Sequence, residues 1–319
     1  MTNKFDVTTL GEILIDFTES DKSDAGMRLF EQNPGGAVAN VACQVARLGK
    51  KSAFIGKTGN DMHGIFLAKT LENIGVDTRG MVMADDVFTT LAFVSISSDG
   101  ERSFSFARKP GADTMLHPSE VSTEILHNTR ILHVGSLSLT DEPARSATHY
   151  AINEAKKMDA IISYDPNYRD SLWTSRETAI EQMRSILPLA DIIKISDEET
   201  ELLTDIQKPQ DAAAKLIDMG VSCVVVTLGK EGALVCTKEG MSRVPAFEGR
   251  VVDTTGAGDS FWGAFLYCMA DSALKPHELT LSKASAFAHF ANAAASICIS
   301  RRGAIPALPS LEEIVKILN

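Results

Sequence analysis

The segment 251–270 reads VVDTTGAGDSFWGAFLYCMA, and two different local patterns meet in it. The almost wholly apolar part from Asp259 onward predicts a buried helix, and RVVD (250–253) predicts the end of a strand. Gly256 and Gly258 lie between them and are typical of a turn. The segment therefore predicts a strand, a glycine turn and a helix in succession.

A carboxylate at the mouth of this turn is unexpected, because a glycine turn before a helix attracts anions. Glycine at 256 and 258 allows successive N–H groups to face one concavity, and the helix start adds partial positive charge. Such a turn can stabilise a phosphoryl group in transfer, and Asp259 can be the general base on the attacking hydroxyl. The simpler alternative is that Asp259 only favours the helix dipole.

The composition is that of an ordinary globular protein. The 319 residues can bury a large core, and the net charge of −11 argues against a nucleic-acid partner. Five widely spread cysteines, with no Cys-x-x-Cys pair, favour buried free thiols in a reducing compartment. The sequence has neither a secretory signal pattern nor an apolar stretch of bilayer length. We therefore expect a cytoplasmic protein without a membrane partner.

Short β-branched runs alternate with helical patterns through the middle of the chain. Residues 130–136, 160–167, 191–196 and 222–229 predict buried strands, and residues 142–158 and 211–220 predict helices. This alternation predicts an α/β fold with a mostly parallel sheet that helices cover on both faces.

Two regions break the alternation. Residues 89–111 predict a hairpin that turns at Asp99-Gly100, and residues 11–33 predict a similar strand pair. We expect these segments to form a small antiparallel sheet that acts as a lid over a ligand crevice. The expected lid comprises residues 12–34 and 87–110, and the expected core comprises residues 1–11, 35–86 and 111–319.

A second glycine segment lies in NPGGAVANVACQVARLG (33–49). Its apolar residues recur at helical spacing, so Asn40 falls in the first turns of a helix that follows Gly35-Gly36. This placement suits the binding of hydroxyl groups, although a helix entry with an exposed Asn is an equal alternative. A phosphate-binding P-loop is excluded at FIGKTG (54–59), because Lys51 stands where the motif needs glycine. The sequence also lacks a dinucleotide-binding glycine motif and the spacing of a His or Cys metal site.

Three further segments have weaker signals. DPNYRDSLW (165–173) follows a predicted strand, at the edge where open α/β sheets bind ligands, but it is also ordinary loop chemistry. In ISDEETELL (195–203), Ser196 and Glu199 have the spacing of a capping box, which alone explains them. VTLGKEGA (226–233) predicts a strand followed by a glycine turn.

Taken together, these motifs resemble those of the PfkB, or ribokinase-like, carbohydrate kinases over essentially the whole chain. GGAVANVACQVARLG resembles the N-terminal motif of the family, and DTTGAGDSFWGAFL resembles its C-terminal motif. Within the family, GEILIDF, NPGGAVANVA, DPNYRDSLW and TLGKEGA are most similar to bacterial fructokinases. The resemblance implies a three-layer α/β/α core with a small β-sheet lid.

The resemblance also implies roles at the sugar and phosphate. Asp259 would be the catalytic base on the primary hydroxyl of the sugar. The anion hole for the γ-phosphate would consist of the amides of Gly256, Ala257 and Gly258. The other substrate contacts that it implies are Asp16, Gly35, Gly36, Asn40, Arg108 and Arg169.

For the nucleotide and ions, the resemblance implies ATP as co-substrate, Mg²⁺, and K⁺ as an optional ion. The implied nucleotide contacts are Asn167, Lys194, Glu199, Thr227, Gly229, Gly232, Gly258 and Asn292. Glu199 would contact Mg²⁺ directly or through water. The implied ligands of the monovalent cation are Asp253, Thr255, Cys298, Arg301 and Gly303. Ala307 stands where ribokinases tend to have serine, which leaves occupancy of the cation site open.

The activity implied is transfer of the γ-phosphate of ATP to the 6-hydroxyl of D-fructose. The absence of the ribokinase lysine from Gly35-Gly36-Ala37-Val38-Ala39-Asn40 argues against ribose. The alternatives are a 2-keto-3-deoxygluconate kinase that uses Arg108 and Arg169, another sugar or nucleoside kinase of the family, and a non-catalytic sugar sensor. The resemblance further implies a homodimer formed through the lid sheet.

Overall fold

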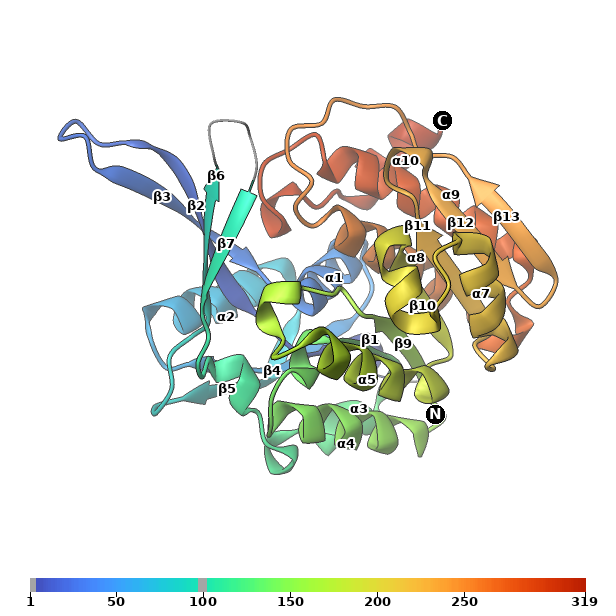
Figure 1. Ribbon diagram of the computed structural model, residues 1–319, viewed down its shortest axis with the longest axis horizontal. Helices are drawn as coiled ribbons and strands as arrows, with labels where there is room; N and C mark the ends of the chain where they lie inside the picture. The colour runs from blue at the N-terminus through green and yellow to red at the C-terminus, as the bar shows by residue number, and fades with distance from the viewer. Residues whose placement is uncertain (1–3, 97–101) are drawn as a thin grey trace.

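Two β-sheets organise the molecule. The computed structural model describes residues 4–96 and 102–319, which form one sheet of nine strands and one of four. Figure 1 shows the small sheet projecting from one side of the body that is built on the large sheet.

The large sheet has the strand order β13-β12-β11-β10-β9-β8-β1-β4-β5. Its strands are β1 (Phe5–Leu10), β4 (Ser52–Gly59), β5 (Asp77–Ala84), β8 (Thr129–Gly135), β9 (Ile161–Asp165), β10 (Ile192–Ser196), β11 (Cys223–Thr227), β12 (Ala233–Thr237) and β13 (Gly240–Val244). The helices are α1 (Ala37–Arg47), α2 (Met62–Ile74), α3 (Thr123–His127), α4 (Ala144–Lys156), α5 (Arg176–Ile186), α6 (Thr200–Thr204), α7 (Pro209–Asp218), α8 (Ala257–Ser272), α9 (Leu281–Cys298) and α10 (Leu311–Leu318).

Seven strands of the large sheet, from β5 to β11, pair in parallel, and β12 and β13 add an antiparallel edge. Alternate residues of a strand face opposite sides, as β11 illustrates. Val224 and Val226 pack into one core cluster, and Cys223 and Val225 pack into the other. This double burial explains why the strands are continuous apolar runs. The predicted mostly parallel sheet is confirmed.

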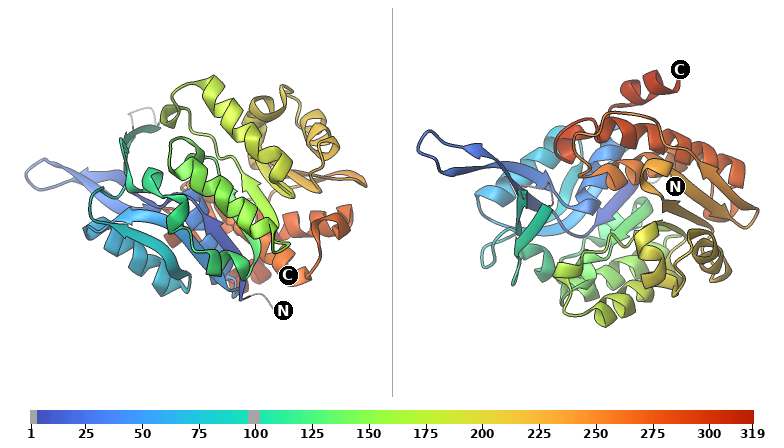
Figure 2. Two further views of the ribbon diagram at one scale, coloured as in Figure 1. Left: turned by 90° about the horizontal axis from the view of Figure 1, so that it is seen from below. Right: turned by 45° about the horizontal axis from the view of Figure 1, so that its top comes forward.

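Helices cover both faces of this sheet, which gives three layers (Figure 2). Residues of α4, α5, α6 and α7 pack into one core cluster, and residues of α1, α8, α9 and α10 pack into the other. The predicted helices at 142–158 and 211–220 correspond to α4 and α7.

The small sheet has the order β3-β2-β6-β7, with β2 (Leu14–Lys22), β3 (Arg28–Gly35), β6 (Leu91–Ile96) and β7 (Arg102–Ala107). The two predicted strand pairs are present, but the prediction of a purely antiparallel sheet is wrong, because β2 and β6 pair in parallel. Both strands leave parallel strands of the large sheet, so they run outward in the same direction. The predicted turn at Asp99-Gly100 lies outside the described residues, and the boundaries between core and lid stay a prediction.

The predicted strand end at 250–253 is also wrong. These residues form no strand, and Val251 and Val252 are 62% and 42% exposed. The main-chain N–H groups of Val252 and Asp253 donate to the Ile299 carbonyl at 2.7 and 3.2 Å. The segment is thus held by Ile299, the C-cap residue of α9, and it pairs with no strand among the described residues.

Two expectations from composition can be compared with the structure. All five cysteines are free, and four of them are buried, with Cys268 half-buried. Within the described ranges, no helix is both long and apolar enough to cross a bilayer.

Candidate active site

A cavity of about 500 Å³ lies at the carboxyl ends of the parallel strands, beside the small sheet. It is lined from β2, β7, β10, β11, the start of α1, the loops after β1, β8 and β9, and the turn before α8. The lining residues that the sequence predicted for the site are Asp16, Gly36, Asn40, Asn167, Arg169, Lys194, Thr227, Thr255, Gly256, Gly258 and Asp259.

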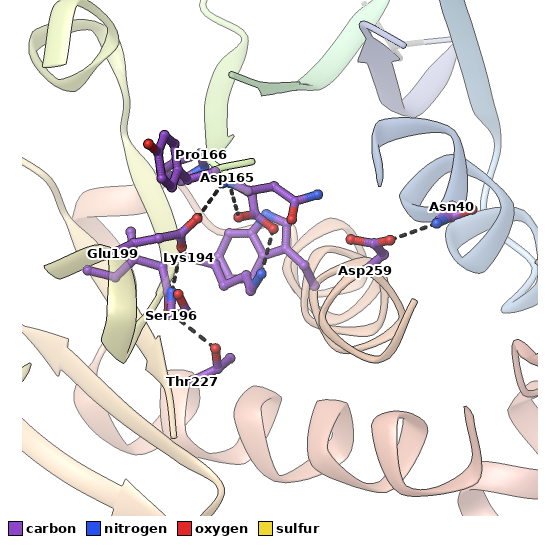
Figure 3. Close-up of polar contacts among 12 residues, drawn as sticks. Asn40, Asp165, Pro166, Lys194, Ser196, Glu199, Thr227 and Asp259 are labelled. Carbon is purple, nitrogen blue, oxygen red and sulfur yellow. Dashed lines mark hydrogen bonds and ion pairs between the residues drawn. The ribbon is translucent and has the colours of Figure 1, made fainter. Parts of the chain in front are cut away.

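Asp259 and Asn40 meet at this cavity from residues 219 positions apart. Nδ2 of Asn40 donates to Oδ2 of Asp259 at 2.7 Å, as Figure 3 shows. The helices that carry them pack closely, since a Cβ at Gly263 would lie 2.6 Å from Cβ of Gln44. Asn40 is buried, which excludes the alternative of an exposed Asn at a helix entry.

Burial raises the pKa of Asp259 above its usual value, and the hydrogen bond from Asn40 and the charge of Lys194 oppose this rise. The carboxylate of Asp259 is buried, hydrogen-bonded by an amide and open to a cavity, and a raised pKa in such a place is typical of functional sites. This environment would suit a general base, and that role stays a prediction.

Part of the glycine turn before α8, the N–H groups of Gly256 and Gly258, has the geometry of an anion-binding nest. Gly256 is the N-cap, its φ is 76°, and no side chain caps the helix. Within residues 4–96 and 102–319, the N–H groups of Gly256 and Gly258 have no main-chain acceptor, whereas the Ala257 N–H donates to the Thr254 carbonyl at 3.3 Å. Two of the three predicted amides are therefore available to an anion. The role of Ala257 stays a prediction.

A buried cation lies next to this turn. Nζ of Lys194 lies close to Gly258, since a Cβ built on Gly258 would be 3.1 Å from it. Nζ donates a hydrogen bond to Oδ2 of Asp165 at 2.7 Å (Figure 3). Burial lowers the pKa of Lys194, but the carboxylates of Asp165 and Glu199 outweigh this effect and raise it. Lys194 therefore stays charged and can attract a phosphate to the turn.

Glu199 is held in place by two main-chain donors. Its Oε2 accepts from the Ser196 N–H and its Oε1 accepts from the Tyr168 N–H, both at 2.7 Å. The predicted capping box at Ser196 is confirmed. In the described part of the chain, no group of three or more His, Cys, Asp or Glu side chains could share a metal ion. Both carboxylate oxygens of Glu199 already accept main-chain N–H groups, and its contact with magnesium stays a prediction.

The predicted sugar-binding residues lie at the base of the small sheet. Asp16 of β2 faces Gly35 of β3, where a Cβ would lie 2.3 Å from Oδ2 of Asp16. Burial raises the pKa of Asp16 to about 6, and Arg169 opposes the rise. The Gly36 backbone has φ 109°, and a Cβ there would lie 2.5 Å from the Glu12 carbonyl oxygen. Glycine is thus required for the close approach of this turn to Glu12 and Ile13, just before β2.

The two predicted arginines differ in position. Arg169 lines the cavity, is exposed and donates to the Tyr168 carbonyl at 2.8 Å. Arg108 does not line this cavity. Its side chain is only 4% exposed and binds Asp113, Thr140 and the Leu137 carbonyl. The structure therefore brings Arg169, but not Arg108, to the predicted site.

Four of the eight residues predicted for the nucleotide, Glu199, Gly229, Gly232 and Asn292, lie beyond the cavity lining. Gly229 follows β11, and Gly232 lies where a Cβ would be 2.1 Å from the Val244 carbonyl oxygen. Nδ2 of Asn292 donates to the carbonyls of Val244 and Pro245 at 3.1 and 2.9 Å. Gly232 and Asn292 thus shape the segment after β13, and their nucleotide contacts stay predictions.

The predicted cation ligands come from two adjoining segments. Oδ1 and Oδ2 of Asp253 accept from the N–H groups of Thr255 and Gly303 at 2.9 and 3.1 Å. The Cys298 thiol lies 3.8 Å from the Thr255 carbonyl, and Arg301 forms an ion pair with Glu313. The predicted ligands, a carboxylate and main-chain carbonyl oxygens, are of the kind that suits a hard cation, and their role stays a prediction.

Sequence reasoning missed Glu12, and it named Asp165 only as part of the loop segment 165–173, without its partner. Glu12 lines the cavity, and Asp165 binds Lys194 just behind it. Asp165 ends β9 beside β10, which carries Lys194, so position at the ends of neighbouring strands could have indicated the pair. Glu12 follows β1 within two residues, but its partner lies 25 residues away and no local pattern indicates it.

Comparison with known proteins identifies the family of this chain. The family model described as pfkB family carbohydrate kinase matches residues 4–311. The chain belongs to the pfkB family of carbohydrate kinases. The predicted resemblance to this family is thereby confirmed.

Relatives of this pfkB family kinase cover its whole length. It is 43% identical to the probable fructokinase-5 of Arabidopsis thaliana, over 100% of this chain and 99% of that protein. A fructokinase from Xylella fastidiosa with bound ATP superimposes with a TM-score of 0.89 at 32% identity, over 98% of each chain. A fructokinase from Vibrio cholerae O395, with fructose, ADP and calcium ion bound, superimposes with a TM-score of 0.88 at 33% identity, over 98% of each chain.

Proposed function

We propose that this pfkB family kinase transfers the γ-phosphate of ATP to the 6-hydroxyl of D-fructose. The observation that carries the proposal is the placement of Asp259, which faces the cavity one residue after Gly258 and is bound by Asn40. A base and an anion-binding turn thus share one wall. The similarity to fructokinases over the full chain supports fructose as the acceptor.

In the proposed reaction, Asp16 and Asn40 bind hydroxyl groups of the sugar, and the primary hydroxyl lies against Asp259. Asp259 takes the hydroxyl proton as the oxygen attacks the γ-phosphorus, and ADP leaves. The N–H groups of Gly256 and Gly258 and the ammonium of Lys194 stabilise the charge on the transferred group. Glu199 would hold, through water, the magnesium ion that accompanies ATP. The magnesium ion would neutralise charge on the phosphates.

A monovalent cation fits beside the turn without a part in the proton transfer. Asp253 and the carbonyls of Thr255, Cys298, Arg301 and Gly303 are its proposed ligands, and potassium is the proposed ion. The two segments that carry them already contact each other through Asp253 and Gly303. The ion would stiffen the turn that holds the γ-phosphate.

Two features favour a neutral sugar over 2-keto-3-deoxygluconate. Asp16 accepts hydrogen bonds from hydroxyl groups but repels a carboxylate. Arg108, which a keto-acid would need, is fully engaged by Asp113, Thr140 and Leu137. Among the residues that the structure describes, Arg169 is the one arginine that lines the cavity.

A sugar panel tests the proposal. The purified protein with ATP and Mg²⁺ is given fructose, ribose and 2-keto-3-deoxygluconate, with and without potassium, and ADP release is followed. We expect the highest kcat/KM with fructose, and NMR should identify fructose 6-phosphate as the product. A preference for the keto-acid would overturn the substrate, and sugar binding without phosphate transfer would support a non-catalytic sensor.

The small sheet also supports a proposed homodimer. Leu29, Phe30 and Phe93 are 45%, 36% and 39% exposed, and Phe93 stacks on Phe17 with ring centroids 5.4 Å apart. Exposed apolar side chains on a sheet with free edges favour pairing between copies. Light scattering should give twice the chain mass, and Phe93→Ser should shift it toward the single chain. A monomeric wild-type protein would contradict this.

A further inference from the structure

The chain passes between the two sheets at four places, and each place contributes one group, a side chain or a main-chain N–H, to a set of polar contacts. Glu12 precedes β2, Ala37 follows β3, Thr90 precedes β6 and Arg108 follows β7. Asp113, in the core just after the second hairpin, completes the set. We call these five residues the crossing cluster.

Asp113 fastens both ends of the second hairpin. Its Oδ2 accepts from Nε of Arg108 at 2.8 Å and forms an ion pair with Nη2 at 2.7 Å, and its Oδ1 accepts from the Thr90 hydroxyl. Arg108 and Asp113 have side chains that are 4% and 1% exposed. Because both charges are removed from water, the stability of this ion pair depends on keeping the two side chains in contact.

Glu12 fastens the first hairpin in the same way. Its Oε1 accepts from the Ala37 N–H at 2.7 Å, which joins the residues before β2 and after β3. Ala37 begins α1, and the N-cap, Gly36, has no side chain to satisfy the free N–H groups there. Glu12 thus supplies from a distant segment the capping acceptor that α1 lacks.

The start of α1 sets the position of Asn40. Asn40 lies three residues after Ala37, and its N–H donates to the Gly36 carbonyl at 2.8 Å. Its side chain then reaches Asp259 at 2.7 Å. A shift of Ala37 therefore moves the amide that binds the base.

We propose that Glu12 is a positioning residue for phosphate transfer: by binding the Ala37 N–H it sets α1, and so holds Asn40 against Asp259. This inference rests on the proposed kinase function and adds a residue to it. Glu12 acts through Ala37 and helix α1, and it need not touch the sugar.

The chemistry of the bond says which substitutions preserve it. Oε2 of Glu12 is buried and, among the described residues, has no hydrogen-bond partner. Burial raises the pKa of Glu12 to about 7, so the neutral form is present near neutrality, and its carbonyl oxygen still accepts from Ala37. The acceptor matters and the charge does not, so glutamine can replace glutamate.

The experiment compares three variants of Glu12 in the full-length protein, using whichever panel sugar the wild type phosphorylates fastest. Glu12→Gln keeps the acceptor, Glu12→Ala removes it, and Glu12→Asp keeps the charge but is too short to reach Ala37. Asp191→Ala is the control. Oδ2 of Asp191 accepts from the Ile162 N–H at 2.7 Å at the amino ends of β9 and β10, whereas the cavity lies at the carboxyl ends of the strands. If Glu12→Ala does not fold, Glu12→Asp takes its place.

We expect Glu12→Ala and Glu12→Asp to lower kcat/KM for the sugar by about 10²-fold, the effect of a catalytic contact displaced by about 1 Å. The KM for ATP should stay within about twofold, because the nucleotide side is not displaced. Glu12→Gln and Asp191→Ala should keep most activity. Equal losses in Glu12→Gln and Glu12→Ala, or near-normal activity in Glu12→Asp, would overturn the inference and leave the kinase function intact. Failure of the wild type on every sugar would overturn both.

Discussion

At the scale of single residues, Asp259 is the group on which the proposed chemistry depends. Asp259→Asn removes the proton acceptor with little change in volume, so folding and sugar binding should persist. We expect kcat to fall by about 10² to 10⁴-fold, the contribution of a positioned base. Steady-state kinetics and sugar binding by calorimetry check this. Asp271→Asn, on the exposed side of the same helix, is the control and should leave kcat unchanged. Near-normal turnover by Asp259→Asn would show that Asp259 is not the general base.

Asn40 gives a second prediction, on pH dependence. Burial raises the pKa of Asp259 and the Asn40 hydrogen bond lowers it, so Asn40→Ala should raise the pKa further. Because the base works deprotonated, the acid limb of kcat/KM should move to higher pH by about one unit. Gln44→Ala, one turn along α1 and bound to Ser260, should leave the limb in place. Overlapping pH profiles for the Asn40→Ala variant and the wild type would contradict the coupling.

At the scale of elements, the turn before α8 holds the available amides. Gly256→Ala introduces a Cβ 2.9 Å from Cβ of Ala304 at φ 76°, so the turn must shift. Loss of one donor to a developing charge lowers kcat by about 10²-fold. Gly26→Ala is the matched control, with the same φ of 76° and nothing within 4 Å of the new Cβ. Equal kinetics for the two variants would mean that the turn does not bind the phosphate.

The elements themselves were predicted unevenly, for reasons that particular segments show. Strands β8 to β11 were predictable because both faces are buried, which demands continuous apolar runs. Residues 250–253 also contain adjacent valines, but they pair with no strand in the described part of the chain, and there β propensity misled the prediction. The parallel pairing of β2 with β6 depends on where each hairpin leaves the large sheet, which local pattern does not encode.

At the scale of the whole molecule, stability should depend on pH through the buried acids. The pKa of Glu12 rises from 4.5 to about 7 and that of Asp16 from 3.8 to about 6. Between the unfolded and folded values the native state binds more protons, so the free energy of unfolding falls as pH rises through this window. Glu12→Gln should remove about 3 kcal/mol of that fall. Urea denaturation at pH 5 and pH 8 measures it; parallel curves for wild type and Glu12→Gln would contradict it.

The sequence by itself determined the family, the parallel sheet and the pairing of a glycine turn with Asp259, because these depend on periodicity and on contiguous motifs. Only the tertiary structure decided which distant groups meet. It joined Asn40 to Asp259, Lys194 to Asp165 and Glu12 to Ala37, and it withdrew Arg108 into a pair with Asp113. Contacts across 25 to 219 residues depend on how helices and sheets pack, and the side-chain types alone leave many partners equally acceptable.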